Sequence, residues 1–183
     1  MRRKGIIAII SILIVLIVAC ILFLTGVIKI DIKSDKKDTY SKNQAIGYIK
    51  YMNACMLVSS DNLVLASQET SPQGITEIQG LEFKSLVVGQ KLEPKDQKAY
   101  KYAIKIIENF KKNSMDADSV YISSDKTASV YVDKVKILFG KDIDTEEKVR
   151  DLREFYDKLK DLDGTLNMTE VSENNAGYTF KKN

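Results

Sequence analysis

Serine and lysine are the residues of this chain that could carry out covalent chemistry, because the sequence contains no histidine. A lysine can replace histidine as the base that activates a serine in the S-x-x-K arrangement. Two such pairs occur, Ser34 with Lys37 and Ser123 with Lys126. The first pair lies in a charged linker and the second in an expected turn, whereas a catalytic lysine needs a desolvated pocket. The sequence therefore predicts a protein that is not an enzyme and has no catalytic residues.

Metal and cofactor chemistry has equally little support in the sequence. Histidine, the commonest metal ligand, is absent, and no glycine-rich loop could hold a phosphate group. Of the two cysteines, Cys20 lies in a long apolar segment and Cys55 in the apolar run from Met52 to Val58. We expect Cys55 to be a buried small hydrophobe rather than a nucleophile. No cofactor, metal or small-molecule ligand is predicted.

The apolar segment runs from Gly5 to Ile28 without a charged residue. As a helix it would be about 36 Å long, enough to cross the roughly 30 Å hydrocarbon layer of a bilayer. The preceding Arg2, Arg3 and Lys4 are expected to stay in the cytoplasm under the positive-inside rule. Residues 5–28 are thus predicted to be a single transmembrane helix of the cell membrane, with the C-terminal part of the chain extracytoplasmic.

Two other interpretations of this segment remain. A cleaved secretory signal has an apolar region of about 7 to 15 residues, which is shorter than this run. The sequence Ile17-Val18-Ala19-Cys20 also resembles the lipobox of a bacterial lipoprotein, in which the cysteine is lipidated. Because an apolar run continues after Cys20 where lipoproteins have a polar tether, the transmembrane interpretation is preferred.

Charge and composition divide the rest of the chain. Residues 1–4 form a cytoplasmic tail, residues 29–44 a juxtamembrane linker of mixed charge, and residues 45–183 one outer domain. The three residues Arg2, Arg3 and Lys4 account for the whole net charge of +3, which leaves 25 Lys and Arg against 25 Asp and Glu. A neutral domain has no general electrostatic reason to bind nucleic acid.

The outer domain shows alternating and apolar runs typical of strands, interrupted by two amphipathic patterns. The expected strands include a hairpin, a β-meander and two final strands, namely 46–49, 55–58, 63–66, 119–123, 127–132, 135–139, 165–169 and 178–181. The first helix is expected to begin at Glu93 and Pro94, and Ala99, Ala103, Ile106, Ile107 and Phe110 should form its buried stripe. The fold class is α+β, a transmembrane helix followed by an antiparallel or mixed sheet with two packing helices.

The second helix is expected to begin at Asp144, whose side chain would cap it while Glu147 reaches back. Its apolar face should comprise Val149, Leu152, Phe155, Tyr156, Leu159 and Leu162. Gly164 would terminate it.

The order of these elements and several short motifs resemble the β domain of the bacterial cell-division family FtsQ/DivIB. The motifs are Ile78-Gln79-Gly80-Leu81, Leu138-Phe139-Gly140, the helix from Asp144 through Lys148, Gly164-Thr165-Leu166-Asn167-Met168 and Tyr178-Thr179-Phe180. The resemblance covers residues 46–181. The POTRA domain that family members carry before the β domain has no room here, because about 15 residues separate Ile28 from the first expected strand.

The resemblance implies a non-enzymatic scaffold of the division septum that binds FtsL-like and FtsB/DivIC-like small bitopic proteins. Strand addition at a sheet edge would supply the contact. The expected partner-binding residues are Gly177, Tyr178, Thr179 and Phe180, with the two aromatic side chains facing the core and the backbone edge available. The alternatives are a membrane-anchored lipoprotein or envelope sensor outside division, and an enzyme of unrecognised type.

Overall fold

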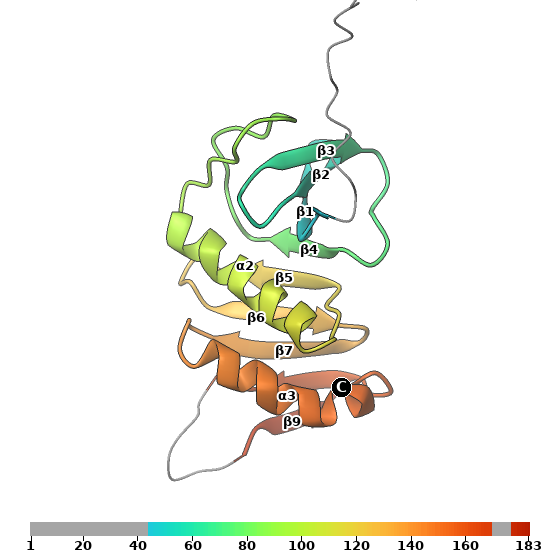
Figure 1. The fold of residues 1–183 in the computed structure, drawn as a ribbon. Helices are drawn as coiled ribbons and strands as arrows, with labels where there is room; N and C mark the ends of the chain where they lie inside the picture. Colours follow the sequence, from blue (N-terminus) through green and yellow to red (C-terminus); the bar gives the residue numbers. More distant parts are fainter. Residues whose placement is uncertain (1–43, 170–176) are drawn as a thin grey trace, which may run out of the picture. The chain divides into compact units, whose positions relative to one another are not determined.

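The computed structural model describes residues 44–169 and 177–183. Within these residues the chain forms nine strands and two helices (Figure 1). In chain order they are β1 (Gly47–Tyr51), β2 (Ala54–Val58), β3 (Val64–Gln68), β4 (Thr76–Gln79), α2 (Gln97–Lys112), β5 (Ser119–Ile122), β6 (Ala128–Val132), β7 (Val135–Gly140), α3 (Thr145–Leu159), β8 (Gly164–Asn167) and β9 (Thr179–Lys182).

All nine strands belong to one mixed sheet with the order β3-β2-β1-β4-β5-β6-β7-β8-β9. Strands β5, β6 and β7 are consecutive antiparallel neighbours, so the predicted β-meander is present. Strand β1 pairs in parallel with β4, β4 with β5, and β7 with β8. The connections β4-α2-β5 and β7-α3-β8 are therefore two crossovers between parallel neighbours.

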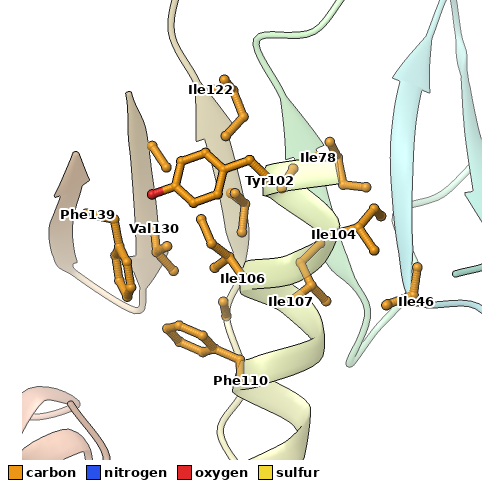
Figure 2. Close-up of a cluster of buried hydrophobic side chains, with 14 of the residues drawn as sticks. Ile46, Ile78, Tyr102, Ile104, Ile106, Ile107, Phe110, Ile122, Val130 and Phe139 are labelled. Atoms are coloured by element: carbon orange, nitrogen blue, oxygen red, sulfur yellow. The ribbon is translucent and has the colours of Figure 1, made fainter. Parts of the chain in front are cut away.

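Both helices lie on the same face of the sheet (Figure 1). The two crossovers advance in the same direction across the sheet, and because such crossovers are right-handed they place their helices on the same side. Figure 2 shows isoleucine and phenylalanine side chains of α2 directed at residues of the strands. The predicted stripe of α2 is confirmed, since its five residues are all buried. The main core lies between this helical layer and the sheet.

The start of α2 differs from the prediction. The helix begins at Gln97, and the Asp96 carboxylate accepts hydrogen bonds from the backbone N–H groups of Lys98 (2.9 Å) and Ala99 (3.0 Å). Pro94 instead pairs with Phe83 in a short antiparallel bridge. This bridge holds the chain extended ahead of the helix. Proline is typical of a first helical turn, but its fixed φ also suits an extended segment, and Pro94 lies in one.

Both ends of α3 also differ from the prediction. Asp144 is the N-cap residue, but it has a left-handed backbone (φ 53°) and its side chain makes no capping hydrogen bond. Side-chain capping needs an extended N-cap backbone that aims the carboxylate at the first amides. At the other end the helix stops at Leu159, and Gly164 begins strand β8 rather than terminating the helix.

The predicted fold class is corrected by the structure. The described chain is a nine-stranded mixed sheet with two helices, and neither helix of residues 44–169 and 177–183 is long and apolar enough to cross a membrane. Helices α2 and α3 have 16 and 15 residues, fewer than the roughly 20 apolar residues that a span requires. Each also has a strongly charged face. The predicted span, residues 5–28, lies outside the described residues.

Candidate functional site

Strand β9 forms one edge of the sheet, and β8 is its neighbour in the described structure. The two strands pair antiparallel, with Leu166 opposite Phe180 and Thr165 opposite Lys181. In the same register the N–H of Asn183 donates to the carbonyl of Asp163. Because hydrogen-bonded pairs alternate along an antiparallel ladder, Lys181 and Thr179 also direct their backbone groups at β8. The N–H and C=O groups of Phe180 and Lys182 therefore point outward from the sheet.

An apolar groove lies beside this edge. It has a volume of about 460 Å³ and is lined by Phe155, Lys158, Leu159, Leu162, Leu166, Tyr178 and Phe180. Helix α3 provides one wall, and β8 and β9 provide the other. The rings of Phe155 and Tyr178 lie 6.3 Å apart at an angle of 48°. Phe155, Leu162, Tyr178 and Phe180 are only partly buried against the core, so the groove has apolar side chains within reach of a bound chain.

Tyr178 attaches the beginning of β9 to α3. Its hydroxyl donates a 2.6 Å hydrogen bond to the Asp151 carboxylate, four residues before Phe155 on the same helix. Burial raises the pKa of Tyr178, and the bond to Asp151 raises it further. The tyrosine is therefore a neutral donor at physiological pH, and the bond is charge-assisted through Asp151.

Gly164 allows β9 to approach β8 closely. Its backbone has φ 155°, and a Cβ at this position would lie 2.2 Å from the carbonyl oxygen of Lys181 and 2.9 Å from the Phe180 ring. No side chain larger than a hydrogen atom fits between these strands. The glycine that the sequence analysis assigned to a helix end thus sets the position of the edge strand.

Positive charge flanks the groove and the edge. Lys181 and Lys182 are exposed on β9, and Lys158 lines the groove. None of the ion pairs formed within the described ranges involves these three lysines. Lysines on an edge strand oppose pairing with a second copy of the same strand, because the like charges would face each other.

The four residues predicted to bind a partner are brought together at this edge. Thr179 and Phe180 lie in β9, and Gly177 and Tyr178 directly precede it. Tyr178 and Phe180 face α3 as expected, but they line the groove instead of being fully enclosed. Sequence reasoning missed Asp151 and Lys158 as members of the site. Their positions in the helix could have indicated this, because Asp151 lies one turn before Phe155 and Lys158 directly precedes Leu159.

The serine and lysine pairs are not arranged for catalysis in the part of the chain that the structure describes. The Ser123 hydroxyl forms hydrogen bonds within its own turn. It donates to the Thr127 carbonyl (2.9 Å) and accepts from the Thr127 N–H. Lys126 is directed away to the Asp96 carboxylate at 2.9 Å. The pair Ser34 and Lys37 lies outside the described residues. Cys55 is buried (4% exposed), as predicted, and residues 44–169 and 177–183 contain no acidic or cysteine cluster that could hold a metal.

Comparisons with known proteins find no match, either among protein-family models or among curated proteins.

Proposed function

We propose that this protein is a non-enzymatic scaffold of the cell-division machinery, and that strand β9 binds a small bitopic division protein by strand addition. The observation that carries the proposal is the exposed edge of β9 next to an apolar groove. A bound strand would receive main-chain hydrogen bonds from Phe180 and Lys182 and would place side chains in the groove. The motifs shared with the FtsQ/DivIB β domain suggest partners of the FtsL and FtsB/DivIC type.

The chemistry of the edge indicates what such a strand should contain. Phe155, Leu162 and Phe180 line the groove, so alternate residues of the partner on the α3 side should be large and apolar. Lys181 is on the opposite face of the sheet, where acidic side chains would complement it. Apolar residues alternating with acidic ones are the pattern we expect in the partner.

The apolar sequence of residues 5–28 supports a location at the cell membrane. With Arg2, Arg3 and Lys4 on the cytoplasmic side, the sheet domain would act outside the cytoplasm. Attachment there would raise the effective concentration of a membrane-bound partner, so even a short edge strand could hold it.

The test compares Phe180→Pro with Phe180→Ala in the full-length protein. Both variants lose the ring, but only proline also removes the outward N–H, and proline is tolerated at a strand edge whose N–H faces solvent. Affinity purification from solubilised membranes of the source cells, followed by mass spectrometry, should recover small bitopic division proteins with the unchanged chain. We expect a partial loss with Phe180→Ala and a complete loss with Phe180→Pro.

A control variant, Ser60→Pro in the exposed turn between β2 and β3, lies away from β8 and β9 and should recover the same partners. Equal recovery by Phe180→Pro and the unchanged chain would refute strand addition at β9. Recovery of proteins unrelated to division, lost equally in Phe180→Pro, would keep the binding edge but reject the division role.

A further inference from the structure

A second cavity, distinct from the groove at β9, has four lysines in its lining. Its volume is about 480 Å³, and its lining includes Lys98, Lys101, Lys126 and Lys141. These residues come from the beginning of α2, the turn between β5 and β6, and the loop between β7 and α3. All three segments follow the carboxyl ends of parallel strands, because β4, β5 and β7 run in the same direction. Open sheets of this kind commonly bind ligands at that end.

The acidic residues around the cavity already have partners. Asp142 pairs with Lys105 at 3.0 Å and accepts a hydrogen bond from Thr145. Asp125 accepts hydrogen bonds from Ser123 and Thr127 in its own turn. Lys126 is neutralised by Asp96 at 2.9 Å.

Three of the lining lysines have no carboxylate partner among the residues that the structure describes. The ion pairs found within residues 44–169 and 177–183 do not include Lys98, Lys101 or Lys141. Hydrogen bonds from hydroxyls do not neutralise the Asp125 carboxylate, so one negative charge also lines the cavity. Three ammonium groups against this one carboxylate leave a net positive charge around one concave surface, and this charge attracts an anion. The beginning of α2 does not account for the attraction, because Asp96 already occupies the N–H groups of Lys98 and Ala99.

The backbone that carries Lys141 is held firmly against α2. Tyr102 also lines the cavity, and its hydroxyl shares its one proton between the Gly140 carbonyl at 3.1 Å and the Lys141 carbonyl at 3.0 Å. Burial raises the pKa of Tyr102 to about 12, so this hydroxyl keeps its proton at any physiological pH. The backbone that carries Lys141 is thereby fixed to helix α2, which carries Lys98 and Lys101, before any ligand arrives.

We propose that this cavity binds a phosphate-bearing ligand, with Lys98, Lys101 and Lys141 as the residues that contact the phosphate oxygens. An ammonium group donates up to three hydrogen bonds and pairs with phosphate as a point charge. The ligand would be a diphosphate, a phosphate polymer or a phospholipid headgroup, which share this chemistry. The site is separate from β9, so ligand binding and partner binding are distinct activities of the domain.

Calorimetric titration of the full-length protein in detergent micelles tests the proposal, with inorganic pyrophosphate as the probe at constant ionic strength. The double variant Lys98→Glu/Lys101→Glu should bind about tenfold more weakly or not at all, because charge reversal replaces attraction with repulsion. The control Lys112→Glu/Lys134→Glu makes the same charge change away from the cavity and should stay within about twofold of the unchanged chain. Lys141→Gln provides a milder variant with an intermediate loss.

Glycerol 3-phosphate, the phosphate portion of a phospholipid headgroup, is the second probe. Tighter binding of glycerol 3-phosphate than of pyrophosphate would identify a lipid headgroup as the source, and the reverse order a soluble or polymeric phosphate. No saturable binding of either probe would overturn the proposal. Equal weakening by the cavity variant and its control would also overturn it, because it would indicate diffuse attraction instead of a site.

Discussion

Strands β3 and β9 are the two edges of the same sheet, but their outer backbone groups have different surroundings. At β3, the N–H of Val64 donates to the Gln90 carbonyl (3.0 Å) and the Val64 carbonyl accepts from the Gly89 N–H (2.8 Å). A turn of the same chain thus covers the beginning of this edge. At β9, no described residue is hydrogen-bonded to the outer side of the strand.

The two edges differ in whether another chain can reach their backbone groups. Gly89 has φ 82°, a left-handed backbone that lets the turn at 87–90 fold back onto β3. Within residues 44–169 and 177–183 no segment covers strand β9 in this way, and the strand carries Lys181 and Lys182, which oppose pairing with an identical strand. The beginning of β3 is closed by the fold itself. In the described part of the chain β9 is protected by charge alone, which a complementary partner could neutralise.

The largest expected effect comes from adding a side chain at Gly164. Gly164→Ala would place a Cβ 2.2 Å from the Lys181 carbonyl oxygen, so β9 must move away from β8. We expect a loss of about 2 to 4 kcal/mol in the free energy of unfolding, together with loss of the binding edge. Urea unfolding measures the first and partner recovery the second.

The matched control for this variant is Gly74→Ala. Gly74 also has a positive φ (70°), but a Cβ there meets nothing within 4 Å. Its cost should be about 1 kcal/mol, from backbone strain only. Similar losses for the two variants would show that close packing of β8 and β9 contributes little to stability.

The next effect concerns the bond that holds β9 to α3. Tyr178→Phe removes the hydrogen bond to Asp151 and should lower the free energy of unfolding by about 1 kcal/mol. The raised pKa of Tyr178 means that the folded protein keeps this proton at a pH where the unfolded chain loses it. The contribution of Tyr178 to stability should therefore be constant up to about pH 10 and decline above it.

Urea unfolding measured from pH 8 to pH 11 checks both the loss of stability in Tyr178→Phe and the decline above pH 10. The decline above pH 10 should be shallower in Tyr178→Phe than in the unchanged chain. Tyr100→Phe is a useful comparison, because burial raises the pKa of Tyr100 as well but its hydroxyl has no hydrogen-bond partner in the described structure. This second variant should reduce the alkaline decline without any loss at neutral pH, and a loss there would contradict the assignment.

Sequence periodicity predicted the elements whose partners are close in the chain. Val120 and Val130 are each flanked by a serine and a tyrosine, and Val135, Ile137 and Phe139 recur at every second position. The β-meander could therefore be recognised from the local pattern. The buried stripe of α2 has the same explanation. The β3 edge was not recognised, because its cover depends on residues 87–92 returning to a strand more than twenty positions earlier.

The candidate site was predictable only in part. A last strand near the chain end suggested an edge, but the outward direction of the Phe180 and Lys182 backbone depends on the register with β8. The groove depends on Leu162 and Leu166 meeting Phe180 across a long sequence separation. Asp144 misled the prediction because an aspartate before a helix usually has an extended backbone, and here it is left-handed.

A smaller effect is expected where the β3 edge is covered. Gly89→Ala introduces a side chain at φ 82°, where a Cβ meets nothing within 4 Å. It should cost about 1 kcal/mol through backbone strain and should speed hydrogen exchange at the Val64 amide, which bonds to this turn. Val88→Ala in the same turn, at an exposed position, should change stability by less than about 0.5 kcal/mol. Unchanged exchange at Val64 would mean that the turn does not close the edge.

The smallest effect on stability is expected from Lys182→Pro. Comparing it with Lys181→Pro distinguishes the outward N–H groups of β9 from those that face β8. The Lys182 N–H points away from β8, so Lys182→Pro removes no bond of the ladder and should change the free energy of unfolding by less than about 0.5 kcal/mol. Lys181→Pro removes the same charge from a neighbouring residue whose N–H faces β8, and it should cost about 1 to 3 kcal/mol. Urea unfolding of both variants in one buffer gives the difference directly. Partner recovery should fall with Lys182→Pro although the domain remains folded. If Lys182→Pro proves the more destabilising of the two, the outward assignment of the Phe180 and Lys182 backbone is wrong, and the edge would present Thr179 and Lys181 to a partner instead.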